Sequence, residues 1–368
     1  MKKIAIVQRH VTNYRINFYN LLYQELYKNN IELTLFAGKT GSTKENEYLK
    51  SGIEYLDFGK EIKNYSLFKT LYWQNIFFEL KKFDLVICEQ ANSTLLNYPL
   101  LLRRKLFNYG PKFAYWGHGK TLEKKSNFLS NSIKKFLTNK ADYWFGYTEH
   151  TRTILDSLGI PNNKISIVNN SIDCDVIKKE RIDNQTSIKD KNQKTVIFCG
   201  RLYKNKKLPF IIDGCKIARK TIKNLNLIII GDGPEKNNIL NLTKDKSWIT
   251  MTGSLYDKEK AKILLKGNMM VLPSHVGLSI LDGFAAGLPI IISDFKNHCP
   301  EIAYFQNNIN GLKTKATTND FAQGIIYLFE NPKILEKMST NAEKTSDQYT
   351  VKDMALKFAY GIIKTLNN

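Results

Sequence analysis

Residues 269–293, with the sequence MMVLPSHVGLSILDGFAAGLPIIIS, predict a strand, a helix and a second strand in succession. The apolar run at 269–272 has the length of a buried strand. Residues 279–286 predict a helix, which Gly287 ends before the next apolar run at 289–293. Two buried strands joined by a helix form a βαβ unit, so this stretch places the chain among proteins built on parallel sheets.

The same alternation extends toward the N-terminus. Nearer to this unit, strands are predicted at 195–199, 224–230 and 248–251, with helices beginning at Leu208, Pro234 and Asp257. In the first half of the chain, strands are predicted at 3–7, 31–36, 83–88, 112–116 and 143–147, with helices at 15–29 and 148–158. Both halves therefore predict α/β folds with parallel sheets.

The stretch 176–194 interrupts this alternation, because it is charged and polar and has no sustained apolar period. We interpret it as a linker between an N-terminal domain at 1–175 and a C-terminal domain at 195–345. The segment 346–368 carries a final amphipathic helix, which we expect to pack back on the N-terminal domain. Two Rossmann-like domains of this kind hold ligands at the carboxyl ends of their strands, so we expect them to face a central cleft.

The composition excludes several classes of protein. Hydrophobic residues make up 43% of the 368 residues and charged residues 24%, unlike a disordered or collagen-like chain. Five scattered cysteines form no CxxC pair, which argues against a zinc site and a disulfide framework. The first residues lack the apolar stretch of a signal peptide, and no run approaches the ~20 apolar residues of a membrane helix. We therefore expect a cytoplasmic protein, with peripheral binding to the inner face of the membrane as its closest membrane association.

The net charge points to an anionic partner. Lys and Arg number 55 against 34 Asp and Glu, which gives a net charge of +21. Such a balance favours binding to nucleic acid, to an anionic membrane surface or to phosphorylated small molecules, although it also aids solubility alone. No helix-turn-helix, zinc-finger or RNP motif is present, so nucleic-acid binding is the weakest of these alternatives.

Two basic residues follow the strand predicted at 195–199. Gly200 and Arg201 come directly after it, and Lys206 stands five residues beyond the arginine. A guanidinium matches the oxygens of a phosphate and a lysine adds a point charge, so the pair can hold a diphosphate. The alternative is a solvated basic loop, because further lysines surround the pair.

The N-terminus of a predicted helix supplies a second candidate site. Gly277, Leu278 and Ser279 lead into this helix, whose first main-chain N–H groups can bind an anion. Asp282 lies about one turn into the helix. There it can accept hydrogen bonds from sugar hydroxyls, or simply stabilise the positive end of the helix.

Two further candidates follow directly after apolar strands. Gly231 begins a turn, but the incomplete GxGxxG pattern argues against a dinucleotide-dependent oxidoreductase. His118 lies between Gly117 and Gly119, where it is accessible and can bind a sugar or act as an acid or base. The alternative for a lone histidine is a structural hydrogen bond.

In order along the chain, these motifs resemble those of glycosyltransferase family 4, whose members are retaining nucleotide-sugar enzymes of the GT-B fold. The resemblance is carried by eight segments: TEHTR at 148–152, VNNSID at 168–173, GRLYKNK at 200–206, GDGP at 231–234, MTGSL at 251–255, LPSHVGLSILDGFAAGLPII from 272, PEI at 300–302 and NGL at 310–312. It covers the C-terminal half closely and the N-terminal half loosely. It implies an α/β fold of the GT-B type.

The resemblance implies roles for individual residues. Arg201 and Lys206 match the basic pair that holds the donor diphosphate, and His118 matches a histidine near the reacting sugar. These three are the expected catalytic residues. The expected donor-binding residues are Gly200, Arg201, Lys206, Gly231, Gly253, Gly277, Leu278, Ser279 and Asp282.

The chain departs from the family pattern at three places. Ser274 stands where the first Glu of the E-x7-E motif is expected, and Asp282 replaces the second, which binds ribose. Ser171 replaces the glycine of an N-G-I-D turn, which we interpret as a hinge turn. The glycines of the family's first loop are replaced by three residues that we expect on the acceptor side: Asn13, Tyr14 and Arg15.

The implied reaction is transfer of a glycosyl group, with retention, from a nucleoside-diphosphate sugar to an acceptor hydroxyl. No metal or other cofactor is expected, because cationic side chains and a helix N-terminus take the electrostatic role of a metal. The donor is expected on the C-terminal domain and the acceptor on the N-terminal domain, with closure about the linker. A nucleotide-sugar epimerase, which needs no acceptor, and a sugar phosphorylase, which needs free phosphate, remain alternatives on the same fold.

The segment 101–140 bears on the nature of the acceptor. It contains ten Lys or Arg and one acid, Glu123, with aromatic residues interleaved. Residues 127–139 predict a basic amphipathic helix, which either lies on an anionic membrane surface or packs its apolar face into the core. Membrane binding would suit a glycan or lipid-linked glycan acceptor, as in surface polysaccharide or lipopolysaccharide biosynthesis.

Overall fold

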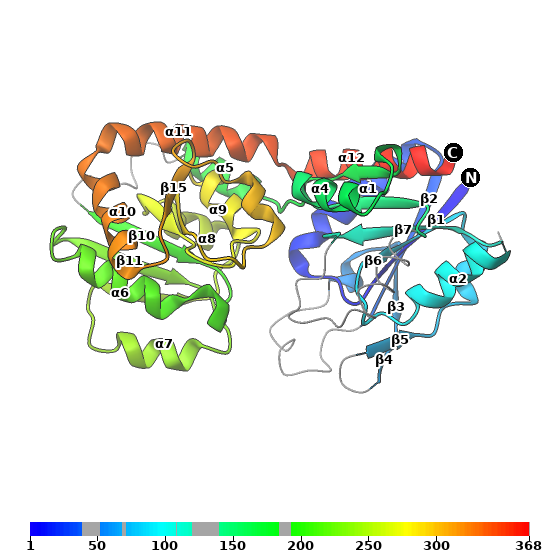
Figure 1. Ribbon diagram of the computed structural model, residues 1–368, viewed down its shortest axis with the longest axis horizontal. Coiled ribbons are helices and arrows are strands. Elements are labelled where there is room, and N and C mark those ends of the chain that lie inside the picture. Colours follow the sequence, from blue (N-terminus) through cyan, green and yellow to red (C-terminus); the bar gives the residue numbers. More distant parts are fainter. Residues whose placement is uncertain (39–51, 68–70, 108, 120–139, 184–192, 368) are drawn as a thin grey trace. The chain divides into compact units, whose positions relative to one another are not determined.

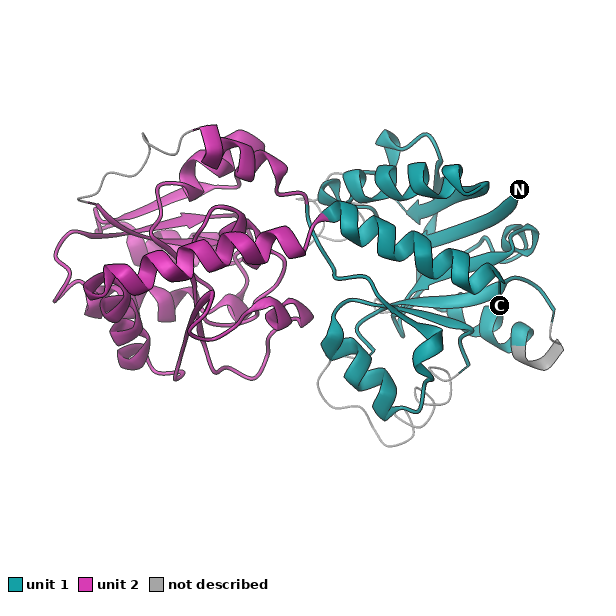
Figure 2. Cartoon of the chain, turned by 90° about the horizontal axis from the view of Figure 1, so that it is seen from above, with its two compact units in different colours: residues 1–172, 351–368 teal, residues 173–350 magenta. Residues whose placement is uncertain are grey.

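The chain folds into two compact units, shown in different colours in Figure 2. The computed structural model describes residues 1–38, 52–67, 71–107, 109–119, 140–183 and 193–367. The first unit consists of residues 1–172 and 351–368, and the second of residues 173–350. Each unit is an α/β fold with a parallel sheet at its centre (Figure 1).

The first unit contains a seven-stranded sheet in the order β3-β2-β1-β6-β7-β8-β9, and all its strand pairs are parallel. Its strands are β1 (Lys2–Gln8), β2 (Ile31–Gly38), β3 (Gly59–Ile62), β6 (Leu85–Glu89), β7 (Lys112–Gly117), β8 (Tyr143–Gly146) and β9 (Ile165–Ile167). A separate antiparallel pair is formed by β4 (Asn64–Leu67) and β5 (Leu71–Gln74). The helices are α1 (Ile16–Lys28), α2 (Asn97–Phe107), α4 (Glu149–Ser157) and α12 (Val351–Asn367).

Two apolar cores lie on opposite faces of this sheet, because successive strand residues point to opposite sides. One core joins Phe18 of α1 and Phe358 of α12 to strand residues such as Phe145 of β8. The rings of Phe145 and Phe358 stack with centroids 4.2 Å apart. Helix α12 therefore completes the first unit, although residues 173–350 separate it from the rest of that unit in sequence.

The second unit contains a six-stranded sheet in the order β12-β11-β10-β13-β14-β15, again with parallel pairs. Its strands are β10 (Lys194–Cys199), β11 (Leu225–Ile230), β12 (Ile249–Gly253), β13 (Met269–Val271), β14 (Ile290–Ser293) and β15 (Gly311–Thr314). The helices are α5 (Asp175–Asp183), α6 (Leu208–Ala218), α7 (Lys236–Thr243), α8 (Asp257–Leu264), α9 (Ser279–Ala285), α10 (Thr318–Glu330) and α11 (Pro332–Gln348).

The prediction of a linker at 176–194 is wrong for the first part of this stretch, which is helical. Helix α5 packs against α8 and α9 and belongs to the second unit. Its buried residues are Ile177 and Glu180, so tertiary packing supports a helix that shows little apolar periodicity in sequence. Residues 184–192 lie outside the described residues. The first stretch of the N-terminal unit also ends at residue 172 rather than 175.

The basic helix predicted at 127–139 also lies outside the described residues. Among the helices that the structure describes, none combines the length and the apolar character needed to cross a bilayer.

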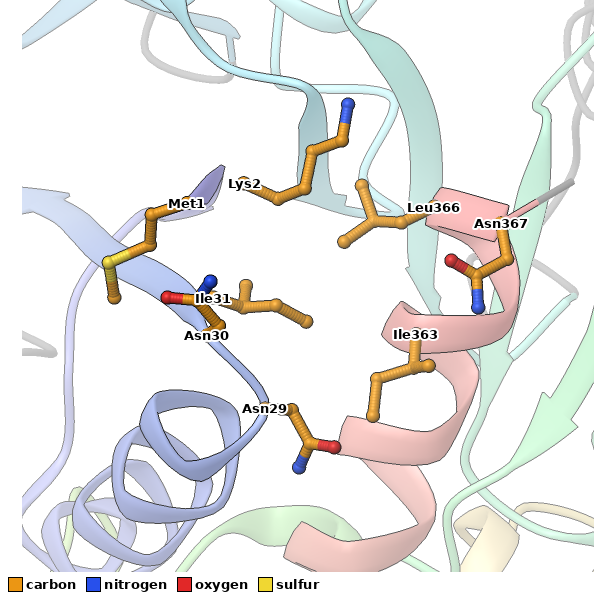
Figure 3. Close-up of a pocket in the computed structure, with 8 residues that line it drawn as sticks. All are labelled: Met1, Lys2, Asn29, Asn30, Ile31, Ile363, Leu366 and Asn367. Carbon is orange, nitrogen blue, oxygen red and sulfur yellow. The ribbon is translucent and has the colours of Figure 1, made fainter.

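A pocket of about 340 Å³ opens at the amino ends of β1 and β2 (Figure 3). Lys2 and Ile31 line it from the strands, and Ile363 and Leu366 line it from α12. This edge of the sheet is opposite to the carboxyl ends of the strands, where ligands bind in parallel α/β folds.

Candidate active site

Three strands of the second unit end in glycines with positive φ angles. These are Gly200 after β10 (φ 151°), Gly231 after β11 (φ 143°) and Gly253 at the end of β12 (φ 74°). The Gly231 N–H donates to the carbonyl of Gly253 over 2.8 Å. A Cβ on Gly231 would lie 2.0 Å from the carbonyl oxygen of Gly200, so a side chain cannot fit there without displacing the main chain. Because these residues are glycines, no side chain covers the main chain at the three strand ends.

Lys206 is buried, with 8% of its surface exposed, and Nζ donates a hydrogen bond to the carbonyl of His275 over 2.7 Å. Burial lowers the pKa of this lysine. Arg201 lies half-buried beside Gly200, and its guanidinium packs over the ring of Tyr203 at 4.8 Å. Lys206 therefore differs from Lys204 and Lys207 of the same loop, which are exposed. The alternative interpretation, a solvated basic loop, is wrong for Lys206.

The loop before α9 is braced by His298. The main-chain N–H of Val276 donates to Nδ1 of His298 over 3.3 Å, and Nε2 of His298 lies 3.1 Å from the carbonyl of Ser293. Nε2 therefore carries the proton, and the ring is neutral. Burial lowers the pKa of His298, in agreement with that state. His298 thus connects the main chain just before Gly277, in the loop that follows β13, to the carboxyl end of β14.

The start of α9 lies close to the first glycine turn. A Cβ on Gly200 would stand 3.9 Å from Oγ of Ser279 and 4.0 Å from the Lys206 side chain. The structure thus brings together Gly200, Lys206 and Ser279 from two strand ends. A Cβ on Gly277 would meet only the Cys299 thiol, at 3.8 Å, and Gly277 is half-buried, so there is room beside its main chain.

Asp282 has a partner that the sequence did not indicate. It is 5% exposed, and its Oδ1 accepts a hydrogen bond from Nζ of Lys260 on α8 over 2.8 Å. Burial disfavours the charged lysine, but the Asp282 carboxylate outweighs this effect and raises the pKa of Lys260. One carboxylate oxygen is therefore already bonded. The sequence spacing could have indicated that Lys260 faces the interior. Lys260 lies four residues before the buried Leu264 and therefore on the same side of α8.

In the first unit, His118 follows β7 and packs edge-on against Tyr147 with ring centroids 4.3 Å apart. The next residue, Gly119, donates its N–H to Oε1 of Gln90 over 2.8 Å. Burial lowers the pKa of His118 from 6.5 to about 4, so the ring is neutral near pH 7. A neutral imidazole can exchange hydrogen bonds with a hydroxyl but does not offer a fixed positive charge.

This depressed pKa predicts a pH dependence of stability. Between pH 6.5 and about 4 the unfolded chain gains a proton at His118 that the folded chain does not accept. The stabilising contribution is complete above that window and is lost as the pH falls through it. We expect His118→Asn to flatten this part of the urea-unfolding profile, whereas His150→Asn, at an exposed position on α4, should leave it unchanged. Equal steepness in wild type and His118→Asn would contradict the assignment.

Arg15, which the sequence predicts on the acceptor side, is buried and bonded to a turn. It is 8% exposed, and Nη1 donates to the carbonyl of Ser171 over 3.1 Å. Nη2 donates to Oδ1 of Asn170, and the guanidinium lies 5.5 Å from the ring of Trp116. Arg15 thus holds the turn that contains Asn170 and Ser171. The other two residues expected on the acceptor side, Asn13 and Tyr14, are exposed.

Asp173 and Asp175 have a spacing that can bind metals, but they form the start of α5. Oδ1 of Asp173 accepts the main-chain N–H of Asp175 over 2.9 Å. Within the part of the chain that the structure describes, no group of three or more His, Cys, Asp or Glu side chains is arranged to hold a metal ion.

Family models cover both units of this two-sheet chain. Residues 179–345 match the family described as glycosyl transferases group 1, and residues 18–176 match glycosyltransferase family 4. Both matches are to glycosyltransferase models, so the chain is a glycosyltransferase, with the family 4 match over residues 18–176. The protein is therefore an enzyme of the transferase class. The nucleic-acid-binding alternative suggested by the net charge finds no support in either match.

Relatives of this glycosyltransferase agree with that assignment. An uncharacterized glycosyltransferase of Methanocaldococcus jannaschii is 25% identical over 340 residues, which cover 85% of each chain. The structure resembles Anabaena HepE in complex with UDP, with a TM-score of 0.71, 13% identity and coverage of 99% of this chain and 100% of that one. It also resembles the lipopolysaccharide outer core galactosyltransferase WaaB, with a TM-score of 0.69, 17% identity and coverage of 98% and 99%. This glycosyltransferase has the GT-B fold, as expected.

Proposed function

We propose that this glycosyltransferase moves a sugar, with retention, from a nucleoside-diphosphate sugar to a hydroxyl of a glycan or lipid-linked glycan. The observation that carries the donor assignment is the convergence of Gly200, Lys206 and Ser279 at the strand ends of the second unit. HepE of similar fold has been crystallised with UDP and with UDP-glucose, which supports a nucleotide-sugar donor.

The chemistry follows from the charge of the leaving group. The bond between the anomeric carbon and the diphosphate oxygen breaks, and its electron pair leaves with the diphosphate. The acceptor oxygen bonds to the same face of the anomeric carbon, and its proton passes to the departing phosphate. Arg201 and Lys206 stabilise the charge that develops there, and fixed cations of this kind need no metal to do so.

The proposed donor-binding residues divide by type of contact. Main-chain N–H groups at Gly277, Leu278 and Ser279 face the diphosphate and the donor sugar. Gly200, Gly231 and Gly253 leave room for the donor at the strand ends, since the N–H groups of Gly200 and Gly231 are already bonded to main-chain carbonyls. Asp282 holds ribose through the oxygen that Lys260 does not occupy. His118 of the first unit contacts the reacting sugar as a neutral ring.

The acceptor side of the proposal rests on charge and on one structural neighbour. The excess of Lys and Arg at 101–140 favours an anionic membrane surface, where a lipid-linked acceptor is found. WaaB, of similar fold, acts on the outer core of lipopolysaccharide. We therefore place the enzyme in the cytoplasm, peripheral to the inner face of the membrane, in surface polysaccharide or lipopolysaccharide biosynthesis.

A thermal-shift screen tests the donor assignment. We expect one of UDP, GDP, ADP, CMP and dTDP to raise the melting temperature without added metal, because a ligand that binds the folded state stabilises it by mass action. For each of the four diphosphates, the matching monophosphate serves as the control and should act more weakly, since it lacks one of the two phosphates that Arg201 and Lys206 contact. No shift with any nucleotide at millimolar concentration would reject the proposed donor site.

A further inference from the structure

Three buried polar atoms at the carboxyl edge of the first sheet have no hydrogen-bond partner among the described residues. They are Nε2 of Gln8 at the end of β1, Nε1 of Trp116 on β7 and Nδ1 of His118 just after β7. Trp116 is 3% exposed, so its N–H cannot be satisfied by bulk solvent. Buried polar atoms in folded proteins are nearly always paired, and a cluster of unpaired ones therefore indicates a bound ligand or ordered water.

Glu89 adds a carboxyl group to the same row. Glu89 of β6 lies beside Trp116 of β7 in the sheet register, and Gln8 and Glu89 directly follow the neighbours Val7 and Cys88. Val7 and Cys88 belong to one apolar core and Trp116 to the other. Because side chains alternate along a strand, Gln8, Glu89 and Trp116 point to the same face of the sheet.

The surroundings of this row are aromatic, and two cations lie near it: Arg15, whose guanidinium is 5.5 Å from the Trp116 ring, and Arg9, whose main-chain N–H bonds to Glu89. The ring of Tyr147 lies 6.1 Å from that of Trp116 and 4.3 Å from that of His118. Tyr19 of α1 is buried, and burial raises its pKa, the Arg15 charge lowers it, and Tyr147 and Glu89 raise it further, so these groups lie near one another. These contacts place residues from α1, β6, β7 and β8 around one point.

We propose that this cluster, defined as Gln8, Glu89, Trp116 and His118, is the acceptor site and binds the hydroxyl groups of an uncharged saccharide. A hydroxyl both donates and accepts hydrogen bonds. It can donate to the Glu89 carboxylate, accept from the N–H groups of Trp116 and Gln8, and pair with either tautomer of His118. A fully ionised phosphate accepts but does not donate, so it offers no hydrogen bond to Glu89 and places its negative charge beside that carboxylate.

The unpaired buried atoms and their neighbours are the evidence for a binding site. Its assignment as the acceptor site rests on the proposed function. Glu89 and His118 are partly exposed, so a ligand can reach the cluster from the sheet edge. The sequence contained one signal for Glu89 that was not used: a polar Glu-Gln pair directly follows the apolar strand predicted at 83–88.

Saturation-transfer NMR with methyl glycosides of neutral hexoses and N-acetylhexosamines tests the site on the full chain. We expect at least one glycoside to bind to wild type. Glu89→Gln should weaken that binding by about tenfold, because hydrogen bonds to charged groups are the strong ones. Trp116→Phe keeps the ring and removes the N–H, and it should weaken binding severalfold. Trp144→Phe is the matched control, because Trp144 is fully buried in the core on the opposite face.

Unchanged glycoside binding in both Glu89→Gln and Trp116→Phe would overturn the proposal and leave ordered water as the partner of these atoms. Absence of any glycoside binding to wild type would overturn it equally. The nucleotide thermal shift separates this result from the donor assignment. Loss of glycoside binding with an intact response to UDP supports the site, and the same loss without any nucleotide response keeps the saccharide site but rejects the transfer reaction. If Glu89→Gln does not fold, Trp116→Phe decides the question alone.

Discussion

Arg201→Ala is expected to lose transfer activity by roughly two to three orders of magnitude while the chain stays folded. The size of the loss is that of removing one fixed donor from a developing negative charge, about 10²–10³ in turnover. The guanidinium is half-buried at the surface of the second unit and packs on Tyr203, so its removal leaves no buried cavity. The measurement is the rate of nucleoside-diphosphate release from the nucleotide sugar whose base the thermal-shift screen identifies.

Lys204→Ala is the matched control for this experiment. Lys204 carries the same positive charge as Arg201. It is exposed and lies only three residues from Arg201, in the same loop. We expect this variant to keep most of the wild-type rate. Wild-type turnover in Arg201→Ala, with circular dichroism unchanged in both variants, would remove Arg201 from the diphosphate site.

Lys260→Met is expected to destabilise the second unit by about 3–5 kcal/mol, the usual effect of removing one partner from a buried ion pair. The Asp282 side chain is 8% exposed and that of Lys260 is 21% exposed. Methionine keeps the apolar part of the lysine and removes its charge, so the carboxylate stays buried without a cation. Urea unfolding of the variant against wild type measures the difference.

Two further variants make the interpretation specific. Adding Asp282→Asn to Lys260→Met removes the unpaired charge and should recover most of the lost stability. Lys178→Met breaks an ion pair with Asp347 whose acidic side chain is 64% exposed, so it should change the free energy of unfolding by about 0–1 kcal/mol. Equal unfolding midpoints for wild type and Lys260→Met would mean that the pair contributes nothing to the fold.

The sequence predicted the strands better than the connections between them. The predicted strands agree with the observed ones to within two residues at each end, as for 195–199 against β10. Such strands are buried on both faces and therefore appear as continuous apolar runs. Helix α5 and the short strands β3, β4, β5, β9 and β15 were not predicted, because a charged surface or a run of three or four residues carries too little pattern.

The candidate site was predictable where main-chain geometry decides it. Gly200 and Gly231 have φ angles that favour glycine, and the sequence shows the glycines directly. Side-chain partners were not predictable, because they depend on residues far apart in the chain. Arg15 bonds to a turn 156 residues away, and Lys260 bonds to Asp282 across 22 residues. A local sequence pattern cannot indicate contacts between residues so far apart in the chain.

The position of α12 has a consequence for how the chain folds during synthesis. Its residues Met354, Phe358 and Ile362 are fully buried in the core under α1, yet the ribosome makes them after the whole second unit. The second unit is continuous from 173 to 350 and can fold as soon as it emerges. The first unit must wait with an open apolar face while the whole of residues 173–350 is synthesised. Chaperones that bind nascent chains therefore have their longest opportunity on the half that is synthesised first.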